Sequence, residues 1–220
     1  MSDITLLIIA ISVFVGGHEL LSHPLRAPLV ARLGEKGFLL VYSAVALGSL
    51  GWAGQLWKGI APERLWSLPP YANALALVAM LFAFILFVGS VTAPNPALMG
   101  MPAGGSPRGV MRITRHPMMW SFAIWAVVHI AMSADPRTIV LASGILTLAL
   151  FGAAMQDRKK DVALGEAWAG WRVKTSFVPF GHGQFWPGWI AVIGGAILFA
   201  VATWLHPILG GPVVGWWTGR

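Results

Sequence analysis

Basic side chains and a histidine stand directly before a long apolar run, in the segment 112–121. Pro117 has a fixed φ and no N–H, which suits the first position of a helix, so His116 lies beside the unbonded amides of a helix N-terminus. That end carries partial positive charge. Together with Arg112 and Arg115 it attracts anionic groups and favours the neutral, metal-ligating form of histidine. The segment therefore predicts either an anion and metal site or a simple arginine anchor at a membrane surface.

The end of the first apolar run carries a second group of ionisable side chains. His18 and Glu19 lie within this run, and His23 and Arg26 follow shortly after it. An ionisable group inside a membrane costs free energy, so it usually pairs with another group or marks a functional site. Glu19 is accordingly an interfacial residue, a partner for Arg26 or a part of a site at this end of the helix.

Two further histidines, His129 and His206, lie in later apolar runs. A helix rises ~1.5 Å per residue, which places His129 ~20 Å beyond His116, and one cofactor plane cannot use both. Depth instead pairs His18 with His116 and His129 with His206. Each pair is a candidate metal or haem site, and a hydrogen-bonded structural role is the alternative.

The composition is that of a membrane protein. Of the 220 residues, 57% are hydrophobic and only 10% are charged, whereas soluble domains are usually ~25% charged. The net charge of +7 resides in short clusters between apolar runs, which indicates membrane topology and excludes a continuous nucleic-acid surface. No cysteine occurs, which excludes disulfides, iron–sulfur ligation and a cysteine nucleophile. The six histidines remain as the strongest candidate metal ligands.

Apolar runs of about 20 residues are long enough to span a bilayer as helices. They predict a single all-α domain over residues 1–220, a polytopic membrane bundle of about six transmembrane helices near residues 4–22, 37–57, 72–93, 117–134, 138–156 and 188–207.

Charge asymmetry predicts the orientation of this bundle. Most of the 15 Lys and Arg residues fall in the first, third and fifth connections. These eleven are Arg26, Arg32, Lys36, Arg108, Arg112, Arg115, Arg158, Lys159, Lys160, Arg172 and Lys174. We therefore expect odd-numbered loops in the cytoplasm, both termini outside, and a location in a bacterial inner membrane.

The fifth connection, residues 156–180, mixes charges with aromatic side chains. This pattern predicts an interfacial helix whose Trp168 and Trp171 lie among lipid head groups while its basic residues meet anionic lipid. His182 follows between glycines, and we do not expect it to be a ligand.

Three stretches together resemble the NnrU family. They are Gly-His and Leu-Gly-Glu-Lys-Gly-Phe between Gly17 and Phe38, Arg-x-Thr-Arg-His-Pro from Arg112, and the stretch from Asp157 that ends in Thr-Ser-Phe-Val-Pro-Phe at Phe180. The family takes in bacterial proteins associated with denitrification and the plant 15-cis-ζ-carotene isomerase. The resemblance covers most of the chain.

The resemblance implies a haem b cofactor with His18 and His116 as catalytic axial ligands to iron. It also implies that Arg26, Arg112 and Arg115 meet the haem propionates, and that the implied activity is redox-gated cis–trans isomerisation of a lipophilic polyene such as ζ-carotene. His129, His206, His23 and Glu19 remain alternative ligands or cavity residues. The plant proteins can carry a Cys near the Arg-His-Pro, and its absence here argues against a cysteine ligand switch.

Two other functions remain open. The Arg-His-Pro and a later acidic position also resemble membrane methyltransferases that use S-adenosylmethionine, although Arg158 replaces the second carboxylate of their acidic pair at Asp157. The third possibility is a non-enzymatic membrane protein that supports denitrification by nitrite or nitric oxide reductase. The expected partners are a lipophilic small molecule and membrane lipids, with no nucleic acid.

Overall fold

The computed structural model describes residues 2–97 and 105–208, which are helical with no strand among them. The elements are α1 (Asp3–Ser22), α2 (Arg26–Gly59), α3 (Tyr71–Thr92), the 3-10 helix η1 (Gly109–Arg112), α4 (Pro117–Ser133), α5 (Pro136–Leu164), α6 (Glu166–Lys174) and α7 (Trp189–Leu205).

Within the described ranges, four helices are long and apolar enough to cross a membrane, namely α1, α2, α3 and α5. Two shorter apolar helices, α4 and α7, have 17 residues each. At ~1.5 Å per residue they are roughly 26 Å long, slightly below the ~30 Å of a bilayer core. The predicted all-α membrane bundle is thus confirmed among the described residues, and the orientation of its termini and loops stays a prediction.

The chain divides into two compact units. The first comprises Met1–Pro69 and Ala126–Gly152, and the second comprises Pro70–Trp125 and Ala153–Arg220. The prediction of one domain over the whole chain is not tested by this division and stays a prediction.

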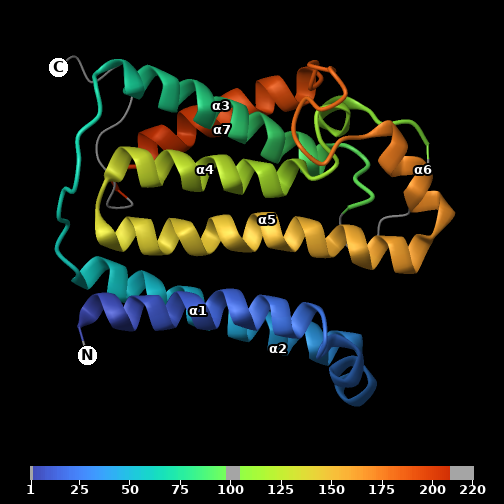
Figure 1. Ribbon diagram of the computed structural model, residues 1–220, viewed down its shortest axis with the longest axis horizontal. Helices are drawn as coiled ribbons and strands as arrows, with labels where there is room; N and C mark the ends of the chain where they lie inside the picture. Colours follow the sequence, from blue (N-terminus) through green and yellow to red (C-terminus); the bar gives the residue numbers. More distant parts are fainter. Residues whose placement is uncertain (1, 98–104, 209–220) are drawn as a thin grey trace. The chain divides into compact units, whose positions relative to one another are not determined.

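In the first unit, α1 and α2 lie side by side (Figure 1) around a core formed by Leu7, Ala10, Ile11 and Ala53. A Cβ at Gly17 would meet Val45 Cγ1 at 3.0 Å, so this glycine lets the two helices approach closely. Arg137 closes one end of the unit by donating to the Trp57 and Ile60 carbonyls at 3.1 and 2.7 Å.

In the second unit, α3 and α7 lie side by side (Figure 1), and glycines permit their close contact. A Cβ at Gly195 would lie 2.7 Å from the Cα of Ile85, a backbone atom that cannot move aside cheaply. A cluster of eight buried residues forms the core of this unit: Leu86, Ala97, Val110, Met111, Ile113, Trp168, Trp171 and Ala191.

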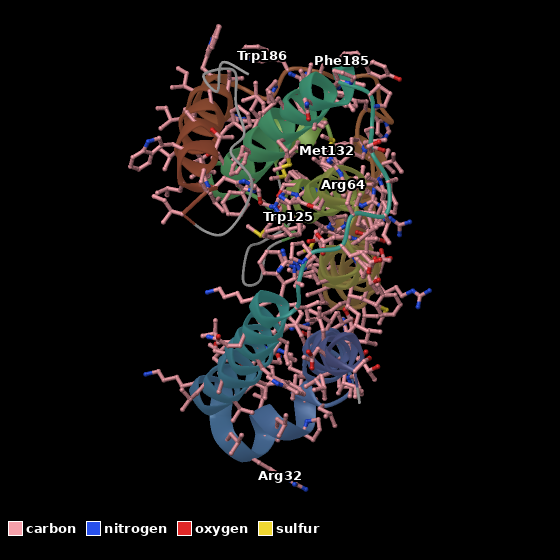
Figure 2. The ribbon with its side chains drawn as sticks, turned by 90° about the vertical axis from the view of Figure 1, so that its left-hand side faces the viewer. Arg32, Arg64, Trp125, Met132, Phe185 and Trp186 are labelled. Carbon is pink, nitrogen blue, oxygen red and sulfur yellow. The ribbon has the colours of Figure 1, made fainter. Side chains whose placement is uncertain are left out.

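Two helices differ from their expected bounds. α2 begins at Arg26 rather than near residue 37, since a further helical stretch precedes the expected one. The two stretches join at a kink at Gly34, whose φ of 70° suits glycine. In this early part of α2, Arg32 extends away from the ribbon (Figure 2). α5 runs on to Leu164, since its charged continuation remains helical until Gly165 breaks it at φ 51°. The expected interfacial segment is therefore the end of α5, the short helix α6 and a turn region.

The prediction that Trp168 and Trp171 lie among lipid head groups is wrong. Their exposed fractions are 0% and 4%, and both belong to the protein core. Both tryptophans belong to the same buried cluster as Val110 of η1, so protein side chains rather than lipid cover the apolar face of α6. Exposed aromatic residues in this unit include Phe185 and Trp186 (Figure 2).

Trp168→Ala should lower the free energy of unfolding by about 3–5 kcal/mol, because it removes a fully buried indole. Trp189→Ala, at a position 68% exposed, is the matched control and should change it little. Denaturant titration of both variants in detergent micelles measures the difference. Equal stability of the two variants would contradict the burial of Trp168.

Gly195→Ala should destabilise the α3 and α7 packing by about 1–3 kcal/mol, because its methyl group would overlap the Ile85 backbone. Gly48→Ala meets no atom within 4 Å and should be neutral or slightly stabilising, since Ala favours helix over Gly. Thermal unfolding of both variants tests this opposition of sign. A neutral Gly195→Ala would mean that the two helices are not in close contact.

Candidate functional site

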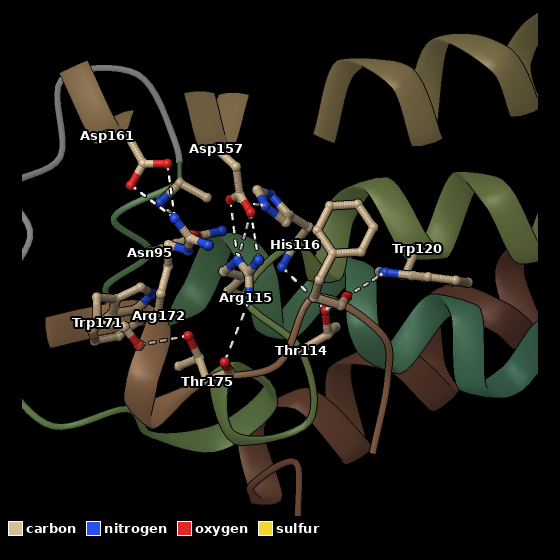
Figure 3. Close-up of polar contacts among 12 residues, drawn as sticks. Asn95, Thr114, Arg115, His116, Trp120, Asp157, Asp161, Trp171, Arg172 and Thr175 are labelled. Carbon is tan, nitrogen blue, oxygen red and sulfur yellow. Dashed lines mark hydrogen bonds and ion pairs between the residues drawn. The ribbon is translucent and has the colours of Figure 1, made fainter. Parts of the chain in front are cut away.

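The second unit holds a buried charged cluster around the Asp157 carboxylate, near the end of α5 (Figure 3). Arg115 Nε donates to both carboxylate oxygens, at 3.0 and 2.9 Å, and Arg115 Nη2 donates to Oδ2. His116 Nε2 lies 2.6 Å from Oδ1. Two adjacent residues immediately before α4 thus share one carboxylate on α5, and we call these three residues the Arg-His-Asp cluster.

The Arg-His-Asp cluster is removed from water. The side chain of His116 is 0% exposed, and those of Arg115 and Asp157 are 10% and 13% exposed. A charge in such surroundings is tolerated only when it is paired and hydrogen-bonded. The bidentate arginine satisfies that condition for Asp157, so the pair is neutral in sum and His116 provides a further donor.

The ring of His116 has one committed nitrogen and one free nitrogen. A carboxylate accepts hydrogen bonds, so Nε2 is the donor toward Asp157 in this contact. Nδ1 is buried and has no hydrogen-bond partner within residues 2–97 and 105–208. In the neutral ring that nitrogen carries a lone pair, which is the electronic requirement for a metal ligand.

The turn after α6 fixes the backbone beside this histidine. Arg115 N donates to Ser176 O at 2.8 Å, and Thr114 Oγ1 donates to Phe177 O at 2.7 Å. The Trp120 indole donates to the same Phe177 carbonyl at 2.8 Å. We call residues 175–177 the strap, since these bonds tie it across the start of α4. The strap leaves the His116 main chain little freedom to move.

A groove of about 470 Å³ opens beside the strap and is lined in part by Arg115, Arg172 and His182. Arg172 bonds the Asp161 carboxylate at 2.9 and 3.0 Å, in a pair that is nearly half exposed. His182 is exposed, and the expectation that it is no ligand stays a prediction.

An apolar pocket of about 170 Å³ lies among α3, α4 and α7 in the same unit. Half of its eight lining residues are aromatic, namely Phe84, Phe87, Phe122 and Trp125. Ser121 contributes the polar atom of the lining, and its hydroxyl already donates to the Met118 carbonyl at 2.8 Å. The pocket suits hydrocarbon rather than a polar ligand.

His18 lies on α1 in the first unit. Its Nδ1 is 2.9 Å from the Phe14 carbonyl, which can only accept, so Nδ1 carries the hydrogen and Nε2 holds the lone pair. Phe14 and Tyr42 contact the ring with edge-on geometry, at centroid distances of 4.5 and 5.2 Å. The Phe14 carbonyl therefore fixes one ring nitrogen of His18.

The other predicted site residues have different partners. Glu19 lies 3.3 Å from His23, and Arg26 bonds Glu35 at 2.5 Å, so Glu35 rather than Glu19 is the partner of Arg26. Arg112 Nε donates to Gln184 Oε1. Two further histidines stand at helix positions: His129 is within α4, and His206 caps the end of α7. In the described part of the chain, no three His, Cys, Asp or Glu side chains form a protein-only metal site.

Asp157 is the site residue that sequence reasoning missed. The sequence pattern indicates one position of a methyltransferase-like acidic pair, whereas the structure shows the Asp157 carboxylate hydrogen-bonded to Arg115 and His116. The need to balance the charge of Arg115 is the sequence feature that could have indicated Asp157. A buried arginine at the edge of an apolar run requires a carboxylate, and Asp157 directly follows the apolar part of another such run.

Asp157→Ala should lower the free energy of unfolding by about 3–5 kcal/mol, because it leaves the Arg115 charge buried and unpaired. Asp161→Ala, four residues later on the same helix, removes the exposed partner of Arg172 and should cost about 1 kcal/mol or less. Denaturant titration of both proteins at neutral pH measures the contrast. Similar losses would show that the first pair is solvated.

Comparisons with known proteins agree with the resemblance noted above. The chain is 36% identical over 72 residues to the chloroplastic 15-cis-zeta-carotene isomerase of Zea mays, which covers 33% of this chain and 20% of the relative. It is 23% identical over 154 residues to that of Arabidopsis thaliana, covering 67% and 42%.

A probable multidrug resistance protein NorM of Chromobacterium violaceum is 29% identical over 123 residues, covering 55% of this chain and 22% of that protein. The chain thus spans less than half the length of each of these relatives. No solved structure matches it. A family model described as NnrU protein matches residues 6–214, nearly the full length. This chain belongs to the NnrU family.

Proposed function

We propose that this chain is a haem b-binding membrane protein that catalyses redox-gated cis–trans isomerisation of a lipophilic polyene. Membership of the NnrU family and similarity to two plant proteins named as 15-cis-zeta-carotene isomerases support the class of reaction. The apolar helices support a membrane location. The charge distribution supports a bacterial inner membrane with odd-numbered loops in the cytoplasm.

One observation carries the haem assignment: the buried Nδ1 of His116 has no partner in the part of the chain that the structure describes. A buried nitrogen lone pair without a donor costs free energy unless it serves another purpose. Coordination to iron would satisfy it. The opposite nitrogen is held by Asp157, and metal-ligating histidines usually have such a carboxylate or carbonyl behind them.

The resemblance names His18 as the second axial ligand. Its Nε2, which bonds none of the residues that the structure describes, and its carbonyl-held Nδ1 meet the same chemical requirement. Among the predicted propionate partners, Arg115 is engaged by Asp157, while the one side chain that Arg112 bonds within residues 2–97 and 105–208 is the neutral amide of Gln184. We therefore assign the larger propionate role to Arg112, because its full charge remains available to an anion.

The substrate class is supported by the apolar pocket among α3, α4 and α7. Its aromatic walls offer dispersion contacts to a conjugated chain, and Phe87 and Phe122 stand edge to face at 5.9 Å. Such a pocket excludes water from a bound hydrocarbon. The chemistry that haem b supplies when bound is that of a redox-gated Lewis acid for a polyene double bond.

Absorption spectroscopy of the purified protein tests the proposal. The wild-type protein should show a Soret band and reducible α and β bands. His116→Ala and His18→Ala should each lower haem affinity by about tenfold or more and shift the Soret band, since even outer-sphere losses at metal sites cost ~10–100-fold. His182→Ala, in the exposed turn, is the control and should retain the wild-type spectrum.

Other outcomes separate the alternatives. Wild-type haem content in both His variants would overturn the ligand assignment, and the same measurement on His129→Ala and His206→Ala would then test the second pair. A protein that binds S-adenosylmethionine in calorimetry and no haem would be a methyltransferase. A protein that binds neither ligand would match a non-enzymatic role in denitrification.

A further inference from the structure

We propose that Asp157 is a positioning residue that holds His116 as the Nε2–H tautomer, so that His116 offers Nδ1 as its metal-ligating atom. This inference rests on the proposed haem function for the identity of the metal. The family resemblance gives neither the ligating atom of His116 nor a role for Asp157. The contacts of the Arg-His-Asp cluster carry it in three steps.

The first step is the direction of the hydrogen bond. His116 Nε2 and Asp157 Oδ1 are 2.6 Å apart. A carboxylate that already receives Arg115 is ionised and accepts only, so the hydrogen is on Nε2. With one ring hydrogen placed there, the neutral imidazole has its lone pair on Nδ1.

The hydrogen-bond partners available to the His116 ring favour the same tautomer. A hydrogen on Nδ1 would be buried with no acceptor among the described residues, whereas a lone pair there is available to a metal. A ring protonated on both nitrogens would likewise leave the Nδ1 hydrogen without an acceptor among the described residues. The Nε2–H neutral ring is the form in which every ring hydrogen has an acceptor.

The Asp157 carboxylate and the His116 ring are also held rigidly in place. Three N–H contacts from Arg115 prevent the carboxylate from rotating away, and Arg115 Nη1 itself reaches the Thr175 carbonyl of the strap at 3.4 Å. The Phe177 ring meets the imidazole at a centroid distance of 5.3 Å and an angle of 63°. The His116 backbone N–H donates to Thr114 Oγ1 at 3.3 Å. The ring is therefore fixed in direction as well as in tautomer.

His18 provides an internal contrast. Its Nδ1–H donates to the Phe14 carbonyl, so the atom that it offers is Nε2. The two histidines named by the resemblance are thus held as opposite tautomers, by a carboxylate in one case and by a neutral carbonyl in the other. Their nitrogen signals are distinguishable for this reason.

Nitrogen NMR on histidine-labelled protein, purified without haem and held in lipid nanodiscs, tests the tautomer directly. The signals lost in His116→Gln identify the residue. We expect a protonated Nε2 and an unprotonated Nδ1 for His116, and the reverse for His18. A His116 ring with hydrogen on Nδ1 would overturn the proposal, whatever the protein's haem content.

Asp157→Asn tests the positioning role, with Asp161→Asn as the matched control. The amide has one acceptor oxygen, for which Arg115 and His116 compete, so His116 should populate both tautomers and haem affinity should fall about 10–100-fold. Asp157→Glu should restore part of the affinity, and Asp161→Asn should change neither measurement.

The outcomes distinguish the two proposals. If the wild-type protein binds no haem, the proposed function fails, while the NMR spectrum still decides whether Asp157 sets the tautomer. If the wild-type protein binds haem but Asp157→Asn leaves both the tautomer and the affinity unchanged, the positioning role is wrong and the haem function stands. When Asp157→Asn does not fold, the wild-type NMR spectrum alone decides the assignment.

Discussion

The pairing of the Asp157 carboxylate with Arg115 and His116 is the constraint on which the second unit depends. A buried arginine must be neutralised where water is scarce, because removing the partner of a buried charge costs about 3–5 kcal/mol. This requirement joins the start of α4 to the end of α5 across 41 residues of sequence. It explains why ionisable side chains are buried together here, although only 10% of the residues in the chain are charged.

Backbone hydrogen bonds reinforce that link. The Ile113 and Ser176 carbonyls accept from Phe180 and Arg115, so two irregular segments satisfy each other's main-chain groups. In apolar surroundings no water is present to bond these N–H and C=O groups, so hydrogen bonds between the two segments have the lowest free energy. A rigid main chain next to His116 follows, and a rigid main chain is what a precisely directed ligand requires.

The same unit combines this polar cluster with an aromatic hydrocarbon pocket and a partly basic groove. Close packing of α3 on α7 depends on small residues such as Gly195, because membrane helices associate through shape and contact rather than through exclusion of water. The second unit therefore contains both an apolar pocket and a buried, paired carboxylate in the Arg-His-Asp cluster.

The sequence by itself determined the helical membrane class, the approximate helix positions, the Arg-His-Pro motif and the family. These depend on local hydropathy and on contiguous residues, which a reader of the chain sees directly. Only the tertiary structure decided that Asp157 completes the cluster, that α5 extends past its apolar part, and that Trp168 is buried in protein. Those features depend on which distant side chain supplies a compensating charge or a covering surface, and apolar periodicity is the same whether lipid or protein covers a helix face.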